Sequence, residues 1–192
     1  EFVSNNKQRP DFIFTGYKIL NSDGSAHYSF SKEGVFDKKK LAHGNYLGCS
    51  GVVISRTVFK KYYFNTLPDL IMFEDWQLWL RVIAEHPLYC LPAESIHMIN
   101  HAGRSVLSCG AEQLIVKIHC LKKEVLNSVP FVSASFWLRR SFVSGIYSYA
   151  ALHIALSGKR RDLVVKYLAK TLAVNPFFIL RRRFAAILKH LF

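Results

Sequence analysis

Several features that define particular protein classes are missing from this 192-residue sequence. No apolar run approaches the ~18 residues that cross a bilayer, and no charged start followed by an apolar stretch marks a signal peptide, so we expect neither a transmembrane helix nor a leader. There is no Cys-x-x-Cys pair and no Cys/His cluster with zinc spacing, which argues against a structural metal. The four cysteines are scattered, which is typical of a reduced, cytosolic protein.

Negative charge is scarce, and it is unevenly distributed. The chain carries a net charge of +13, yet residues 1–110 hold 12 Lys/Arg against 10 Asp/Glu, whereas residues 111–192 hold 14 against 3. The excess therefore lies almost entirely in the second segment. This predicts a boundary near residue 110 and an anionic partner for the basic segment, either nucleic acid or an anionic membrane surface.

Large apolar and aromatic residues are abundant, at 51% and 14%, so the chain can bury a substantial core. The first segment alternates strand and helix signals. We expect a strand over 11–20 followed by a turn, a surface loop or short helix around 38–40, a buried strand over 52–54 and a short helix capped by Ser55. An amphipathic helix is predicted from Asp75 to His86, then a short strand over 88–92 and an extended segment over 95–103.

Beyond residue 110 the apolar spacing is helical throughout. Helices are predicted over 111–126, from about Ser133 to Leu156 and over 161–174, with Ser157-Gly158 and Asn175-Pro176 as breaks. The fold class is therefore α/β: a mixed sheet with helices, followed by an all-helical basic extension.

Two adjacent carboxylates, Glu74 and Asp75, stand at the start of the predicted Trp-rich helix. One interpretation is structural: one caps the helix and the other interacts with the positive end of its dipole, each worth ~0.5–1 kcal/mol. The other is chemical. A carboxylate on a rigid helix start, beside a tryptophan wall that restricts water, can take a proton from an attacking hydroxyl.

Two glycine-containing segments are further candidates. The small residues Gly48, Cys49, Ser50 and Gly51 allow a ligand to approach the backbone, or they allow tight packing before a strand. The loop over 100–108 places His101, Arg104, Ser105 and Ser108 together, where they could bind a diphosphate or be simply solvated.

The final segment, residues 180–192, places Phe184, Ile187, Leu188 and Leu191 on one helix face, with four basic residues outside it. A cationic helix that keeps an apolar stripe is typical of a helix lying on a membrane surface. A solvated helix surface is the alternative. No nucleic-acid-binding module is recognisable, so we favour an anionic membrane surface as the partner and expect no nucleic acid.

The order of these segments resembles family 2 glycosyltransferases of the GT-A fold, of the bacterial kind that builds surface polysaccharide for the cell envelope. The matching stretches are NYLGCS (45–50), EDWQLWLR (74–81) and HAGRS (101–105), and the acidic–aromatic stretch is the most specific. The resemblance covers roughly residues 10–110. It implies that residues 1–110 are the C-terminal, acceptor-side half of such a domain, followed by a membrane-associating extension over 111–192.

The resemblance implies transfer of a sugar from a nucleotide-sugar to a hydroxyl of a saccharide or lipid-linked acceptor, with inversion. Asp75 would be the catalytic base. Glu74, Gly48, Cys49, Ser50 and Trp76 would bind substrate, and His101, Arg104 and Ser105 would bind the diphosphate.

This sequence departs from the family pattern in one respect. Such enzymes hold a divalent metal, Mg or Mn, through an Asp-x-Asp motif in an upstream nucleotide-binding half, and no Asp-x-Asp occurs here. We expect the metal in an intact enzyme, the chain to be a portion of it, and the location to be cytoplasmic, peripheral on the inner membrane. The alternative is a non-catalytic membrane-docking or saccharide-binding module.

Overall fold

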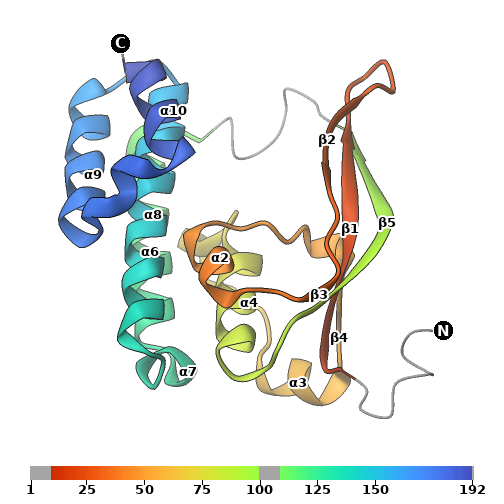
Figure 1. Cartoon of the computed structure of the whole chain (residues 1–192). Coiled ribbons are helices and arrows are strands. Elements are labelled where there is room, and N and C mark those ends of the chain that lie inside the picture. The colour runs from red at the N-terminus through yellow and green to blue at the C-terminus, as the bar shows by residue number, and fades with distance from the viewer. Residues whose placement is uncertain (1–9, 100–108, 192) are drawn as a thin grey trace.

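The structure, a computed structural model, describes residues 10–99 and 109–191 (Figure 1). The strands are β1 (Phe12–Leu20), β2 (Ala26–Phe30), β3 (Gly34–Val35), β4 (Val52–Ile54) and β5 (Tyr89–Ile99). The helices are α2 (Lys38–His43), α3 (Arg56–Lys61), α4 (Glu74–Glu85), α6 (Ala111–Leu126), α7 (Val129–Val132), α8 (Phe136–Leu156), α9 (Arg161–Val174) and α10 (Arg182–Leu191). Three short 3-10 turns are η1 (Cys49–Gly51), η2 (Pro68–Leu70) and η3 (Pro176–Leu180).

The sheet is mixed and is organised around β1. This strand pairs antiparallel with β2 and β4 and parallel with β5, and β5 pairs antiparallel with β3. Phe12 and Phe14 of β1 are buried, and the ring of Phe12 lies 5.6 Å from that of Trp79 in α4. The mixed α/β class predicted from the sequence is therefore confirmed.

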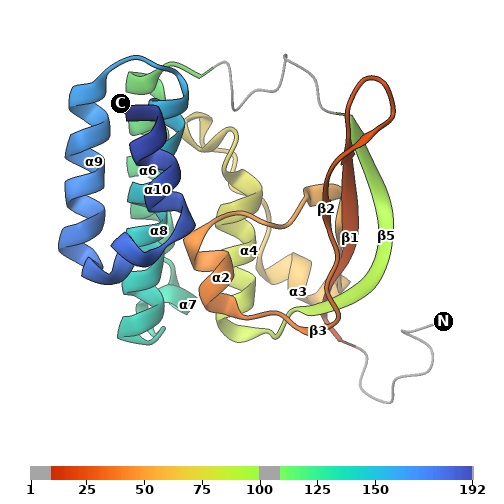
Figure 2. The ribbon, with the colours of Figure 1, turned by 45° about the horizontal axis from the view of Figure 1, so that its top comes forward.

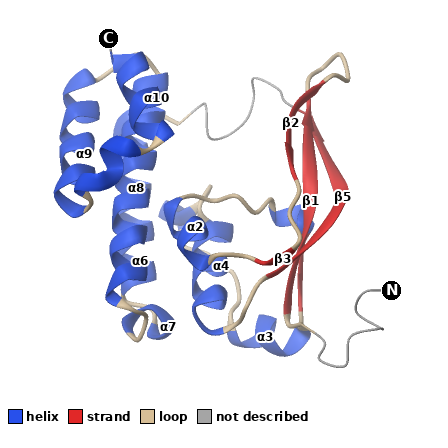
Figure 3. Cartoon of the chain, in the orientation of Figure 1, coloured by secondary structure: helices blue, strands red, loops and turns tan. Residues whose placement is uncertain are grey.

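The described helices are arranged in layers beside the sheet (Figures 1 and 3). Helices α2 and α4 lie next to the strands, and α6, α8, α9 and α10 lie beyond them (Figure 2). One cluster of buried side chains runs from β1 through α4 into α6 and α8. Side chains from before and after the charge boundary near residue 110 therefore belong to one hydrophobic core. Each fully buried large apolar side chain in it stabilises the fold by about 1.5–3 kcal/mol.

A glycine sets the closest approach between α2 and α8. A Cβ atom on Gly145 of α8 would lie 2.4 Å from the carbonyl oxygen of Ala42 and 2.6 Å from the Cα of His43. Such distances are well inside van der Waals contact, so only glycine lets the two backbones meet here. This contact fixes α8 against the segment that leads from α2 into the candidate site.

Most predicted helices and turns are confirmed. The predicted helices over 111–126 and 161–174 coincide with α6 and α9, and Ser55 accepts a hydrogen bond from the Val58 amide as the cap of α3. The residues around 38–40 form the short helix α2. Of the two alternatives predicted for them, the short helix is therefore confirmed and the surface loop is excluded.

Three boundaries or environments differ from prediction. The strand over 52–54 is an edge strand, since it pairs only with β1 among the described strands, and Val53 is 57% exposed rather than buried. The segments predicted as a short strand and a separate extended region form one strand, β5, which continues through Pro92. Helix α8 begins at Phe136, three residues later than predicted, because Ser135 caps it.

The apolar stripe of the last helix is not free for a membrane. Ile187 is fully buried and Leu191 nearly so, with Phe184 and Leu188 partly buried against the same core. The prediction that this stripe is left over is wrong, because α10 folds back onto the neighbouring helices instead of standing alone. Among residues 10–99 and 109–191, no helix is long and apolar enough to cross a bilayer.

Candidate functional site: a buried carboxylate beside a cavity

The start of α4 is tightly constrained. The turn η2 precedes it, and Met72 has a φ of +88°, a conformation that is costly for a residue with a side chain. Phe73 occupies the cap position, so neither Glu74 nor Asp75 is the N-cap, and the capping part of the structural interpretation is wrong. Both carboxylates lie instead in the first turn, where the helix dipole favours negative charge.

Asp75 is a largely buried carboxylate with two hydrogen-bond donors. The side-chain amide of Asn45 donates to Oδ2 at 3.0 Å, and the backbone amide of Trp76 donates to Oδ1 at 2.5 Å. Burial raises the pKa of Asp75 to about 6, while the two donors oppose this shift and the neighbouring Glu74 adds to it. At pH 7 the carboxylate is therefore mainly ionised but basic enough to accept a proton, as a general base requires.

Asp75 lines a cavity of about 370 Å³. Asn45, Tyr46, Leu47 and Gly48 form one wall, and β1 and β5 contribute Tyr17, Ile19 and Met98. This volume falls within the usual range of small-molecule sites, and a few polar groups among apolar walls is the usual composition of such sites. The arrangement can hold a polar molecule with one hydroxyl at the carboxylate.

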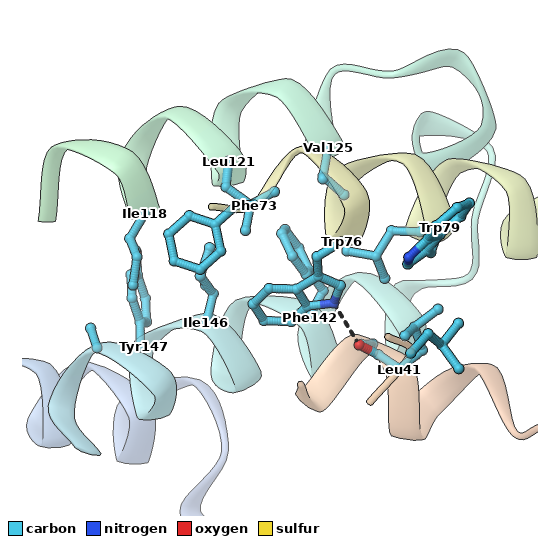
Figure 4. Close-up of a cluster of buried hydrophobic side chains, with 14 of the residues drawn as sticks. Leu41, Phe73, Trp76, Trp79, Ile118, Leu121, Val125, Phe142, Ile146 and Tyr147 are labelled. Atoms are coloured by element: carbon cyan, nitrogen blue, oxygen red, sulfur yellow. Dashed lines mark hydrogen bonds between the residues drawn. The ribbon is translucent and has the colours of Figure 1, made fainter. Parts of the chain in front are cut away.

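Trp76 forms part of the wall of this cavity. Its side chain is fully buried between α2, α4 and α8, and its indole N–H donates to the carbonyl oxygen of Leu41 at 2.9 Å (Figure 4). The ring packs against Phe142 and Tyr149 of α8. Trp76 is among the residues that line the cavity, although its side chain is fully buried, so its predicted contact with substrate stays a prediction.

Glu74 is placed differently from Asp75. Its Oε2 atom is buried and has no hydrogen-bond partner within the described ranges, which is unusual for a polar atom in a folded protein. A buried acceptor without a donor is costly. Glu74 is not among the residues that line the Asp75 cavity, so its predicted contact with substrate stays a prediction. Arg81, also within the family-like stretch, points elsewhere and donates to the carbonyl oxygen of Tyr63 at 2.6 Å.

The glycines of the small-residue turn, residues 48–51, lie in two different environments. Gly48 lines the cavity, and a Cβ there would be 3.9 Å from Met98 and Tyr17, so the position has room for a larger residue or a ligand. Gly51 serves packing, since its Cβ would lie 2.7 Å from the Thr15 carbonyl oxygen. Cys49 and Ser50 are exposed as residues. Partial burial of the Cys49 thiol, together with the nearby carboxylates of Asp75 and Glu74, raises the pKa of that thiol and keeps it protonated.

Two residues of the basic extension line the same cavity and were missed by the sequence analysis. Tyr149 and His153 of α8 have ring centroids 4.1 Å apart. Burial, reinforced by Arg183, lowers the pKa of His153 to about 4, so the imidazole is neutral at pH 7. Their i, i+4 spacing, which places both side chains on one face of α8, is the one signal that could have identified them.

The predicted diphosphate loop, His101, Arg104 and Ser105, lies outside the described residues. Elsewhere in the chain, no group of three or more His, Cys, Asp or Glu side chains is arranged to hold a metal ion. The four cysteines are free thiols. The divalent metal expected of an intact enzyme stays a prediction, and no step below is routed through it.

Comparison of the chain with models of protein families, with curated proteins and with solved structures finds no match.

Proposed function

We propose that this chain is the acceptor-side portion of an inverting GT-A glycosyltransferase, acting on a nucleotide-sugar donor and a saccharide or lipid-linked acceptor. The observation that carries the proposal is Asp75, a largely buried carboxylate with a pKa of about 6 beside a cavity of about 370 Å³. The resemblance of 45–50 and 74–81 to family 2 enzymes agrees with it, since both stretches meet at this carboxylate through the Asn45–Asp75 hydrogen bond.

In this mechanism the acceptor hydroxyl lies against Asp75. The carboxylate takes the hydroxyl proton as the oxygen attacks the anomeric carbon of the donor. The bond from that carbon to the diphosphate breaks, and the diphosphate leaves with the electron pair. Because the hydroxyl oxygen attacks the face opposite the diphosphate, the configuration at the anomeric carbon is inverted. Asn45 holds the Asp75 carboxylate in place through its side-chain amide.

The test is sugar transfer by the native protein that contains this sequence, measured with a panel of radiolabelled nucleotide-sugars and a lipid extract as acceptor. Asp75→Asn keeps the size and the Asn45 contact but removes the base, so we expect transfer to fall by about 10²–10⁴-fold. Glu85→Gln is the matched control, because this carboxylate pairs with Lys61 at the far end of α4. Undiminished transfer by Asp75→Asn would overturn the base assignment.

A second candidate is a membrane-docking module, and one surface favours it. Phe136 and Trp137 at the start of α8 are 66% and 64% exposed, and Arg140 lies over both rings at about 6 Å. Val129 and Val132 of α7 are exposed immediately before them. Aromatic side chains with adjacent arginines are suited to an anionic bilayer interface. We call these five residues the α7–α8 surface; it would place the protein on the cytoplasmic face of the inner membrane.

Vesicle flotation tests this second function. The protein should float with vesicles containing anionic phosphatidylglycerol at low salt and much less in 0.5 M salt, because screening weakens the charge attraction. Trp137→Ser should reduce flotation, whereas Tyr63→Ser, an equally exposed aromatic on the α3 side, should not. If Trp137→Ser floats as well as the unchanged protein, this surface does not dock.

A further inference from the structure

A second pocket, of about 580 Å³, lies next to the Asp75 cavity. It is formed between residues 28–46, which include β2, β3 and α2, and residues 178–183, which join η3 to α10. In Figure 2, α2 lies beside the segment that leads into α10. Tyr46 lines both this pocket and the Asp75 cavity, so the two spaces adjoin at that ring.

Four cationic side chains line this pocket: Lys40, Arg181, Arg182 and Arg183. No Asp or Glu lines it, and within residues 10–99 and 109–191 no ion pair neutralises any of the four. Such a concentration of guanidinium groups without carboxylates attracts anions and binds phosphate oxygens with favourable geometry.

Arg183 is the fixed member of this set. Its guanidinium is partly buried and donates to the carbonyl oxygen of His43 at 2.7 Å and to the hydroxyl of Ser148 at 3.1 Å. Burial, together with the positive charges of Arg181 and Arg183, lowers the pKa of His43 to about 4. Burial is the main cause of this lowered pKa, and the carboxylate of Asp37 opposes it, so the two arginines contribute only part of the effect.

The three arginines occupy positions that are electrostatically unfavourable for the helix α10. Arg182 and Arg183 are in the first turn of α10 and Arg181 directly precedes it, where the helix dipole disfavours positive charge. Arg183 is compensated by its hydrogen bonds to His43 and Ser148, whereas no ion pair within the described residues compensates Arg181 or Arg182. Residues that violate local preferences without compensation are expected at functional sites. An anion bound here would be stabilised by the helix N-terminus and would also relieve the repulsion among the arginines.

The opposite wall is aromatic. The ring of Phe30 lies nearly parallel to that of Tyr46 at 6.4 Å, and Phe36 packs on Phe30 at 6.3 Å. Tyr28 completes this wall and is partly exposed. A pocket with cations on one side and rings on the other fits a ligand with a charged group and an apolar or aromatic body.

We propose that this pocket binds a diphosphate ester, with the diphosphate on Arg181–Arg183 and Lys40 and its apolar or aromatic body on the ring wall. Binding of the diphosphate ester follows from the residues of this pocket alone and does not depend on the proposed function. The role of this binding rests on the proposed glycosyltransferase function. In that role the pocket holds an acceptor or donor by its diphosphate, and the remainder of that ligand passes Tyr46 and reaches Asp75. Two sources share this chemistry, namely a lipid diphosphate and a nucleoside diphosphate.

Calorimetric titration of the chain in EDTA, at low salt, with four probes tests the proposal. The probes are pyrophosphate, farnesyl diphosphate, uridine diphosphate and farnesol. We expect one of the two esters to bind at least tenfold more tightly than pyrophosphate and farnesol. Tighter binding of farnesyl diphosphate identifies a lipid source, and tighter binding of uridine diphosphate a nucleotide source. Farnesol binding as tightly as its diphosphate, or no binding by either ester, overturns the proposal.

Two variants locate the binding. The double variant Arg181→Gln/Arg182→Gln should weaken the ester by at least tenfold. Lys159→Gln/Arg161→Gln removes the same charge from exposed positions at the start of α9 and should change affinity less than twofold. Equal losses in both double variants would mean non-specific attraction to a cationic protein and would overturn the site.

A third variant tests the ring wall. Tyr28→Ser should weaken the ester about fivefold and leave pyrophosphate unchanged. Weakening of both probes alike would overturn the assignment of the body to this wall. Because all these measurements read binding, they can succeed even where sugar transfer fails, which keeps this proposal separable from the proposed function.

Discussion

The side-chain amide of Asn45 donates to the carboxylate of Asp75 at 3.0 Å and joins the segment after α2 to the first turn of α4. The same Asn45 accepts a hydrogen bond from the Leu47 amide through its Oδ1 atom, so its orientation is fixed by its own loop. Asn45 is therefore a positioning residue for Asp75, and its contact favours the ionised form of that carboxylate.

Asn45→Ala should raise the pKa of Asp75 by about one unit above its value near 6, because a hydrogen bond to a charged group is worth about 1.5 kcal/mol or more. Carboxyl carbon resonances of selectively labelled aspartate, followed by NMR through a pH titration, give this pKa directly. A merely structural role for Asn45 would leave the titration midpoint unchanged.

Asn65→Ala is the matched control. Asn65 has the same local arrangement, accepting from the Leu67 amide and donating to a carboxylate, that of Glu124, at 3.1 Å. The variant should therefore disturb its loop to a similar extent without moving the titration of Asp75. A similar shift in both variants would attribute the effect to general loosening of the fold.

Asp75→Asn should stabilise the chain at pH 7 by about 1–3 kcal/mol. The folded protein raises the pKa of Asp75 to about 6 from an ordinary value near 4, so it disfavours the charged form. The folded state holds more protons than the unfolded state between pH 4 and 6, and the penalty is complete above pH 6.

Urea denaturation of both proteins at pH 4 and pH 7 measures this stabilisation. The gain of the variant should be largest at pH 7 and small at pH 4, where the folded state carries a neutral carboxyl group and the unfolded state one that is about half ionised. A variant less stable than the unchanged chain at pH 7 would contradict the buried-charge account. Retention of a destabilising charge is what a functional carboxylate predicts.

The elements of the fold were predictable where the signal is local. Helices α6 and α9 follow apolar spacing with glycine or Asn-Pro breaks at their ends, and Ser55 caps α3 as expected. The exposure of β4 was not predictable, since a run of three apolar residues is compatible with a central strand and with an edge strand. The burial of the α10 stripe likewise depends on which surface the helix meets.

The candidate site was predictable only in part. Asp75 and Gly48 were identified from the sequence and both line the cavity. Tyr149 and His153 were missed because they are more than 70 residues from Asp75 and reach the cavity only through the packing of α8 on α2. No periodicity within a segment reports that kind of contact.

His153→Phe should remove part of the acid sensitivity of the fold. The folded protein lowers the pKa of His153 to about 4, whereas the unfolded chain takes up a proton near pH 6.5. The stabilisation from His153 is therefore complete above pH 6.5 and is lost as the pH falls toward 4, by an amount of about 2–3 kcal/mol. Phenylalanine keeps the ring contact with Tyr149 and cannot titrate.

The measurement is the free energy of unfolding from urea denaturation at pH 7 and at pH 4.5, for the unchanged chain and for His153→Phe. The loss between the two pH values should be smaller in the variant. His43 carries a similarly lowered pKa, so some acid sensitivity should persist, and His43→Phe with His153→Phe should reduce it further. An identical loss in all three proteins would exclude both histidines as its source.

Gly145→Ala should be among the most destabilising single-methyl additions in this chain. The added Cβ would lie 2.4 Å from the Ala42 carbonyl oxygen, and backbone on both sides leaves no flexible side chain to move aside. Helices α2 and α8 would have to separate, at a cost of about 3 kcal/mol that exceeds the small helix-propensity gain of alanine.

Gly110→Ala is the control for this prediction, because no heavy atom lies within 4 Å of its added Cβ and its φ is −64°. It should cost no more than about 1 kcal/mol, the usual value of a changed cap residue. Urea denaturation gives both numbers. Since α2 leads directly into Asn45, the separation forced by Gly145→Ala should also move the Asp75 titration, whereas Gly110→Ala should not. A Gly145→Ala chain as stable as its control would mean that the two helices do not meet at this glycine, and that Tyr149 and His153 do not reach the cavity by this packing.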